Sequence, residues 1–323
     1  MSGPIEVTVS GMKERKRRSA LADFSIRLFR EKPLGIVGAV ITLLLLFAGI
    51  FAEFVAPDGM NEPHPSDYLA QPSAEHPLGA DNLGRDMLSR VIYGARISLL
   101  VGVTAAFLSV LFSGVIGVTC GFLGSKFDIV VQRFVDAWMC FPGIIILIVL
   151  ASVLGRGMWQ LVIAMGLIWG ITNSRLPRSA VVAIKENVYM DAAGAIGCSN
   201  LRIILRHVVP NIFPVIIVMF TVQVPELILA EASLSFLGLG IPPPAPSWGG
   251  MLSGSAMNYM ERAWWMAVFP GLALAVAVYG INVFGDAIRD LLDPKLRGGV
   301  GRYGGVKVSK LKQRRWHNVK KAV

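Results

Sequence analysis

Long apolar stretches, separated by shorter polar segments, repeat along most of this chain. A helix needs about 20 predominantly apolar residues to cross the hydrocarbon core of a bilayer, because each residue adds about 1.5 Å. Six stretches approach or exceed that length, the fourth being the shortest: 34–55, 97–123, 129–154, 159–176, 212–234 and 264–284. The pattern therefore predicts an all-α membrane protein with six transmembrane helices.

Composition favours a membrane protein over a soluble one. Apolar residues make up 54% of the 323 residues and charged residues only 16%, whereas soluble domains carry about 45–50% and about 25%. The first apolar stretch is not expected to be a cleaved secretory signal. A long polar tail precedes it, it exceeds the usual signal core of about 7–15 residues, and no small-residue cleavage site follows.

Basic residues are distributed unequally between the two sides that six crossings would create. Of the 31 Lys and Arg residues, 26 fall in the tails and in the connections after the second and fourth predicted spans, and four fall on the opposite side. Because basic loops stay in the cytoplasm, both termini are predicted to be cytoplasmic. The formal net charge of +10 then reflects topology and contact with anionic lipids, so nucleic-acid binding is not needed to explain it.

This topology divides the chain into a six-span domain flanked by two basic cytoplasmic tails. In the N-terminal tail, the segment from Asp23 is expected either to lie on the membrane as an amphipathic helix or to extend the first span. The three regions are 1–33, 34–298 and 299–323, with an outer loop at 56–94 and a cytoplasmic connection at 177–211 inside the domain.

The outer loops show no spacing that predicts a metal site. His64 and His76 are twelve positions apart, and Asp81 and Asp86 lack the repeated spacing of a calcium loop. These two acids are instead expected to form a turn and to cap the helix after it. The prolines of the last outer loop are expected to exclude a helix, and three tryptophans are expected at the membrane interface: Trp248, Trp264 and Trp265.

Ionisable residues inside the predicted spans are candidates for function, because a charge stranded in lipid is costly. Asp136 lies in the third span, one turn from Arg133, with which it is expected to pair. Glu226 and Glu231 lie in the fifth span. We expect these three carboxylates to line a water-accessible pathway, with structural pairing of Glu226 as the alternative. Four prolines are expected to interrupt helices: Pro142, Pro214, Pro225 and Pro270.

The cytoplasmic connection predicts two short helices that meet at a glycine. Asn187 can cap the first helix, Ser199 or Asn200 can cap the second, and Gly197 suits a left-handed turn because it has no Cβ. Such an elbow of small residues would fit a groove on a soluble partner, whereas a hairpin that packs only on its own bundle is the alternative. The residues expected to contact the partner are Val188, Tyr189, Asp191, Ala192, Ala193, Ile196, Gly197 and Leu201.

This segment resembles the EAA motif found in permease subunits of binding-protein-dependent ABC importers. Asp191, Ala192 and Ala193 stand at the places of its Glu-Ala-Ala, and Gly197 and Pro210 stand at those of its glycine and proline. Asp replaces the more usual Glu and is one methylene shorter. Four further stretches are similar to the dipeptide and oligopeptide branch, which includes nickel permeases: "HPLGADNLGRDMLSRVIYGARISLLVG", "EASLSFLGLGIPPPAPSWGGML", "WWMAVFPGLAL" and "GDAIRDLLDPKL".

The resemblance implies a type I ABC importer permease fold and one half of a heterodimeric channel for peptides in the bacterial inner membrane. The implied partners are a related permease, two cytoplasmic ABC ATPase subunits and an external substrate-binding protein. The elbow from Asp191 to Gly197 would be seated in an ATPase subunit.

The chain itself is not expected to be an enzyme or to hold a cofactor or metal. It has no GxxxxGK[ST] sequence, so ATP and magnesium would be bound by the partner ATPase subunits. The alternatives are an importer of the same architecture that carries nickel or another small solute, and a secondary transporter that does not use ATP.

Overall fold

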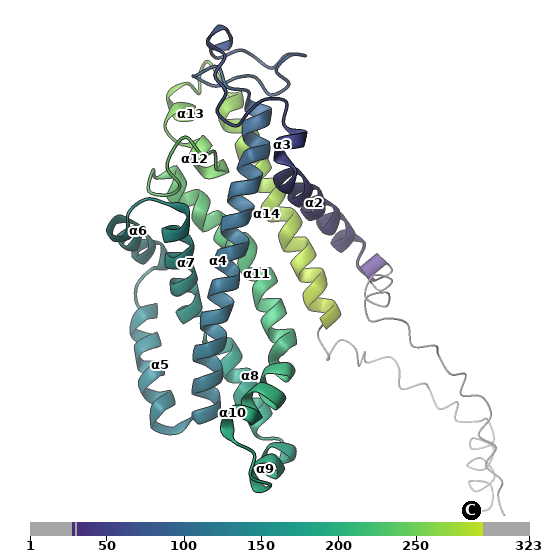
Figure 1. Cartoon of the computed structure of the whole chain (residues 1–323), viewed down its shortest axis with the longest axis vertical. Helices are drawn as coiled ribbons and strands as arrows, with labels where there is room; N and C mark the ends of the chain where they lie inside the picture. The colour runs from purple at the N-terminus through teal and green to yellow at the C-terminus, as the bar shows by residue number, and fades with distance from the viewer. Residues whose placement is uncertain (1–27, 30, 293–323) are drawn as a thin grey trace, which may run out of the picture.

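The computed structural model describes residues 28–29 and 31–292, and every regular element within them is a helix, as predicted. The helices form an elongated bundle, with loops and short helices gathered at its two ends (Figure 1). The two predicted basic tails, including the segment from Asp23, lie outside the described residues except for the last positions before the first long helix.

Four helices in the described residues are long and apolar enough to cross a membrane. The predicted third span is a bent pair, α5 (Ser125–Met139) and α6 (Gly143–Leu154), which would make a fifth crossing if counted together. The predicted fourth span is α7 (Met158–Thr172), an apolar helix of 15 residues, which is short for a crossing. The six predicted crossings are therefore not confirmed. The four long helices are α2 (Pro33–Ile50), α4 (Met87–Leu123), α11 (Val209–Phe236) and α14 (Trp265–Leu292).

Proline breaks one helix and is accommodated in two others. Pro142 separates α5 from α6, which meet at 88°, because proline lacks an amide hydrogen and pushes the preceding residue out of the helical region. The prediction that three further prolines interrupt helices is wrong. Pro214 and Pro225 lie inside α11, and Pro270 lies inside α14. Both helices pack on long neighbours, which support the backbone across the missing hydrogen bonds.

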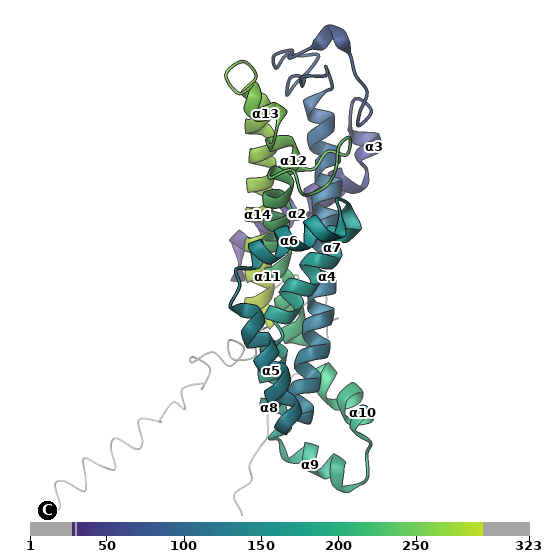
Figure 2. The same ribbon diagram turned by 90° about the vertical axis from the view of Figure 1, so that its left-hand side faces the viewer.

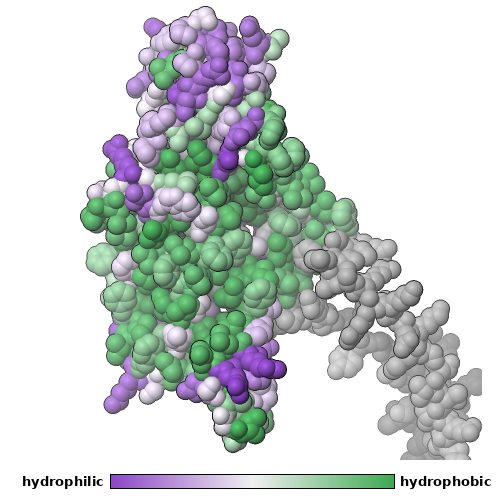
Figure 3. All heavy atoms as spheres, in the orientation of Figure 1, coloured by the Kyte–Doolittle hydropathy of each residue, from purple (hydrophilic) through white to green (hydrophobic). Residues whose placement is uncertain are grey.

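Close helix packing depends on glycine. A Cβ at Gly38 of α2 would lie 2.6 Å from the carbonyl oxygen of Gly280 on α14, so a larger residue would push these two helices apart. The largest group of buried apolar side chains lies between α4, α7 and α11 and includes Leu99, Met165 and Ile228. Apolar side chains also cover much of the outside of the bundle, as Figure 3 shows for one face, which is the surface that lipid requires.

One end of the bundle is covered by a polar structure that we call the outer cap. It consists of the loop at 56–86, which contains the 3₁₀ turn η1 (Pro65–Asp67), and the short helices α12 (Trp248–Leu252) and α13 (Ser255–Asn258). A short helix, α3 (Ala52–Val55), connects α2 to this loop (Figure 1). The cap is the most hydrophilic part of the face in Figure 3.

The prediction that prolines exclude a helix from the last outer loop is wrong, because α12 begins two residues after the last of them. Ser247 caps this helix by accepting a hydrogen bond from the amide of Gly250 at 3.1 Å. A cap also explains why α4 begins ten residues before the predicted span. Asp86 accepts a hydrogen bond from the amide of Ser89 at 2.7 Å, as the sequence predicted for this acid.

Two of the three tryptophans predicted at the membrane interface are buried instead. The indole N–H of Trp248 donates to the carbonyl oxygen of Val91, and that of Trp265 to the carbonyl oxygen of Ala80, each at 3.0 Å. Only Trp264 is exposed. The buried pair packs the outer cap onto the bundle, because each indole supplies a large apolar surface and one satisfied polar group.

The opposite end of the bundle carries the predicted connection. Its elements are α8 (Arg175–Lys185), α9 (Val188–Ala195), α10 (Asn200–Ile203) and the π-helical turn η2 (Ile204–Val208). In both views α9 is the helix farthest from the outer cap (Figures 1 and 2). The prediction of a separate second short helix is wrong, because α10 and η2 continue into α11 as one span of 37 residues.

Candidate functional site

The base of the connection is α8, which is fixed to α4 and α5. Arg178 donates two hydrogen bonds to Asp128 of α5, at 2.6 and 2.5 Å, a bidentate geometry that orients both side chains. Lys185 donates to the carbonyl oxygen of Phe122 at 2.7 Å. At Gly117 of α4, a Cβ would lie 2.4 Å from the backbone that leads into α8. The connection therefore starts from a rigid support.

One side of α9 packs on the bundle. Met190 and Ala193 are buried together with Val208 and Ile212, at the junction of α9 with the first turns of α11. Ala193 was predicted to contact a partner, and its burial in the bundle contradicts that prediction. Its methyl group belongs to the same buried cluster as Met190, Val208 and Ile212.

Polar side-chain contacts are found where α9 begins. Asn187 stands at the predicted capping position, but its side chain does not cap α9. It donates instead to the carbonyl oxygen of Ile184 at 2.8 Å and so closes the end of α8. Two residues later, the hydroxyl of Tyr189 on α9 accepts a hydrogen bond from the side-chain amide of Asn211 on α11, at 3.4 Å. The elbow is thus attached to the helix before it and to the helix after it.

Gly197 ends α9 in the left-handed conformation that the sequence predicted, with φ +81°. Its amide donates to the carbonyl oxygen of Gly194 at 3.0 Å, and the amide of Cys198 donates to that of Ala193 at 3.1 Å. These two bonds form a Schellman motif, which satisfies the carbonyls that a helix end leaves unpaired. No other group lies within 4 Å of a Cβ built at Gly197, so backbone conformation and not space demands glycine.

The other side of the elbow exposes large apolar side chains at the tip of the molecule. The exposed fraction is 82% for Val188 and 80% for Ile196. Water-exposed apolar groups concentrated in this way mark an interaction surface. We call this surface the elbow face; its residues are Val188, Tyr189, Ile196, Leu201 and Leu205, all exposed. Asp191, Ala192 and Pro210, also predicted for the coupling segment, are exposed near it.

The predicted pair of Asp136 and Arg133 is present, with a distance of 3.2 Å between their charged atoms. Arg175, at the start of α8, also pairs with Asp136. The sequence did not reveal this second partner, because it lies 39 positions away and is brought close only by the packing of α7 and α8 beside α5. Asp136 therefore lies between two cations near the base of the connection.

Glu231 does not line a pathway, contrary to the prediction. Its side chain is completely buried and accepts hydrogen bonds from Ser98 of α4 at 3.1 Å and from Ser235 at 2.7 Å. Ser98 in turn accepts a hydrogen bond from the amide of Trp248. The chain of bonds joins α4, α11 and α12, so Glu231 holds the outer cap on the bundle.

Glu226 differs from Glu231 in being exposed, on the opposite side of α11. It accepts a hydrogen bond from the indole N–H of Trp169 on α7 at 2.7 Å. Its side chain borders two adjacent clefts, of 480 and 420 Å³, and Asn173 borders both as well. One cleft runs along α11 toward the end of α14, and the other lies against the bend between α5 and α6.

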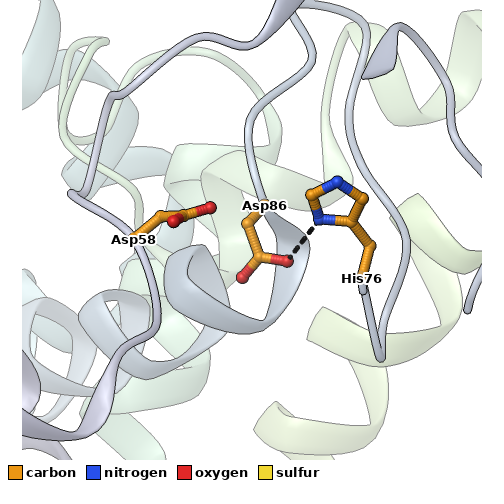
Figure 4. A group of neighbouring side chains, drawn as sticks. All are labelled: Asp58, His76 and Asp86. Atoms are coloured by element: carbon orange, nitrogen blue, oxygen red, sulfur yellow. Dashed lines mark hydrogen bonds and ion pairs between the residues drawn. The ribbon is translucent and has the colours of Figure 1, made fainter. Parts of the chain in front are cut away.

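In the outer cap, His76 lies between two carboxylates, a grouping that the sequence did not predict. Its Nδ1 is 3.3 Å from Asp86 and its Nε2 is 3.2 Å from Asp67. Figure 4 shows that Asp58 also points toward Asp86, and one ligand atom from each of Asp58, His76 and Asp86 lies within 4.8 Å of the others. Burial lowers the pKa of His76, but the hydrogen bonds to Asp86 and Asp67 together raise it by more than burial lowers it. The pKa of His76 is therefore above its usual value.

This geometry could hold a metal ion, but the surrounding contacts do not require one. One oxygen of Asp86 is occupied by the helix cap and both ring nitrogens of His76 face carboxylates. A protonated His76 satisfies these contacts without a metal. The absence of a metal from this chain stays a prediction.

Comparison with known proteins gives matches over most of the chain. The family model described as "Binding-protein-dependent transport system inner membrane component" matches residues 113–298. A putative peptide transport system permease protein of Brucella suis biovar 1 is 37% identical, over 84% of this chain and 90% of the relative. The dipeptide transport system permease protein DppC of Alkalihalophilus pseudofirmus is 38% identical, over 83% and 88%.

A further relative is the glutathione transport system permease protein GsiD of Escherichia coli O6:K15:H31, 38% identical over 84% of this chain and 90% of its own. A solved structure of the MetNI methionine ABC transporter in an inward-facing conformation covers 64% of this chain at 18% identity, with a TM-score of 0.49, which is too weak a likeness to support a conclusion. The family match and the curated relatives suffice: the chain belongs to the family of inner membrane components of binding-protein-dependent transport systems.

Proposed function

We propose that this chain is the permease subunit of an ATP-driven importer and forms half of a translocation pathway for peptides across the bacterial cytoplasmic membrane. Family membership supports the importer. The relatives named for peptide, dipeptide and glutathione transport support a peptide as the solute. Nickel or another small solute is the alternative cargo for the same architecture.

The elbow face is the observation that best supports coupling of this chain to ATPase subunits. It presents apolar side chains to water at the tip of the molecule, while Met190 and the contacts of α8 fix the other side of the segment. A partner seated there would act on α11, because Leu201 and Leu205 of the elbow face lie on the helix that runs from Asn200 to Phe236 without a break. ATP binding would then favour one permease conformation, provided that the ATPase subunits fit the elbow differently in the two conformations.

The remaining partners follow from this role. A related permease would complete the pathway, two ABC ATPase subunits would bind ATP and magnesium, and an external binding protein would deliver the solute to the outer cap. Anionic lipids would contact the basic tails.

This arrangement requires the elbow and both termini to be cytoplasmic. The ion pair between Lys32 and Asp290, at 2.5 Å, supports an even number of crossings, because it brings the two ends of the described chain together.

Uptake by the reconstituted importer tests the proposal. Proteoliposomes that contain this chain, its partner permease and the ATPase subunits should accumulate a labelled tripeptide only with ATP enclosed in the lumen, where the ATPase subunits lie, and with binding protein outside. A tagged chain should also recover the ATPase subunits in mild detergent. Uptake that persists without ATP, together with failure to recover an ATPase, would establish the alternative of a secondary transporter.

A further inference from the structure

The larger of the two clefts beside Glu226 has opposite charges at two positions along its length. It has a volume of 480 Å³, within the range of about 300–1,000 Å³ usual for small-molecule sites. Apolar positions spaced along one side of α11 line it: Pro214, Val215, Val218 and Val222. Glu226 borders it from α11, and Arg289 borders it from the last turn of α14. Two of the apolar positions, Val218 and Val222, lie at levels between these charges.

The acidic position has no cation within the described residues. The only hydrogen bond recorded for the Glu226 carboxylate comes from the neutral indole of Trp169, and none of the described ion pairs includes Glu226. A carboxylate deep in a membrane helix needs a cation or water to offset the loss of hydration. A cationic group of a bound solute would supply that charge.

The distance between the two charged positions follows from helix geometry. α11 and α14 run in opposite directions and approach closely where a Cβ at Gly285 would lie 3.2 Å from the carbonyl oxygen of Thr221. Glu226 is five residues beyond this point on α11, and Arg289 is four residues beyond it on α14 in the opposite direction. At a rise of about 1.5 Å per residue, the two Cα atoms are separated by roughly 13 Å along the bundle.

We propose that this cleft binds short peptides directly by both ends, with Glu226 receiving the terminal ammonium group and Arg289 receiving the terminal carboxylate. An extended tripeptide spans about 10 Å, and the two flexible side chains cover the remaining distance. Val218 and Val222, which lie between them, contact the peptide side chains without selecting among them. This inference rests on the proposed function and adds a selectivity step inside the permease.

Peptides with one charge removed provide the test. Purified permease–ATPase complex, without external binding protein, is titrated with radiolabelled tri-alanine and competed with N-acetyl-tri-alanine or tri-alanine amide. In the wild type, each capped peptide should compete roughly tenfold more weakly than the free peptide, the effect of one lost charge-assisted hydrogen bond. Glu226→Gln should abolish the discrimination against N-acetyl-tri-alanine and keep that against the amide. Arg289→Gln should do the reverse.

Each result is a ratio, the affinity for the free peptide divided by the affinity for a capped peptide, measured within one protein. Partial loss of folded complex therefore does not change it. Glu53→Gln and Arg96→Gln remove the same charges from an exposed pair outside the cleft and should keep the wild-type ratios. The inference is overturned if both cleft variants keep both ratios, or if the wild-type complex does not bind free tri-alanine. In either case ATP-dependent uptake by the whole importer would still support the proposed function, and loss of that uptake in the wild type would reject the function itself.

Discussion

At the scale of single residues, two glutamates on one helix have opposite environments. Glu226 and Glu231 are five positions apart, which places them about 140° apart around α11. Glu231 is buried among hydroxyl groups, whereas Glu226 borders two clefts. Their depth in an apolar stretch was visible in the sequence. The sequence did not show which face of α11 packs against α4, because both faces of this helix are apolar.

This contrast predicts different effects of removing the two carboxylates. Glu231→Ala would leave the hydroxyls of Ser98 and Ser235 without their acceptor in a buried place, and should destabilise the protein by about 1–3 kcal/mol. Glu226→Ala removes an exposed group and should leave stability nearly unchanged. Thermal unfolding of the purified complex measures both variants, and equal shifts in melting temperature would contradict the assignment of Glu231 as structural.

Gly197 is the residue for which the sequence predicted local geometry most directly. Gly197→Val should abolish ATP-dependent uptake but leave membrane insertion intact, because a β-branched residue in the left-handed region costs about 1–2 kcal/mol or more and reshapes the elbow. Gly238→Val is the matched control. It has a similar φ of +76° with open space around it, but lies at the other end of α11. If both variants lost coupling equally, the elbow would have no special role.

At the scale of elements, α9 and the residue that ends it have a buried side and an exposed side. Met190 faces the bundle and Ile196 faces water. Met190→Asp should prevent stable folding, because it buries an unpaired charge. Ile196→Asp should leave the permease stable and reduce the recovery of ATPase subunits in a pull-down. Recovery of a normal amount of ATPase by Ile196→Asp would argue against the elbow face as the contact.

The outer cap is the element whose stability should depend on pH. Hydrogen bonds to Asp86 and Asp67 raise the pKa of His76 above the usual value of 6.5, so the folded state favours the protonated form. The stabilisation is fully present below the unfolded pKa and is lost as pH rises through the folded pKa. The melting-temperature difference between wild type and His76→Gln should therefore be largest at acid pH and shrink above neutral pH. A difference that does not vary with pH would rule out this contribution.

At the scale of the whole molecule, the sequence predicted the helical class and the positions of the apolar helices well. Hydropathy locates these helices because lipid requires long apolar segments. It did not show that Pro142 breaks a helix while Pro225 is accommodated, since that depends on neighbouring helices. The pairing of Arg175 with Asp136 and the grouping of acids around His76 also arise only when distant segments pack together.

The same limit applies to the candidate site. Gly197 and the exposed apolar residues were predicted from local patterns, because turn geometry and composition are local properties. Local patterns did not predict the burial of Ala193 or the continuity of α10 with α11, because both depend on contacts across the bundle. That continuity gives the proposed coupling its mechanical basis, since a partner that contacts Leu201 or Leu205 would act on the helix that borders the Glu226 clefts.

Site-specific photo-crosslinking in the assembled importer tests the central claim most directly. A photoreactive amino acid replaces Ile196 on the elbow face, and in a control protein it replaces Met257 of α13, which is also exposed but lies in the outer cap. The account predicts a crosslink from position 196 to an ATPase subunit and none from position 257. Absence of an ATPase crosslink at position 196, in a complex that still hydrolyses ATP and imports peptide, would contradict it.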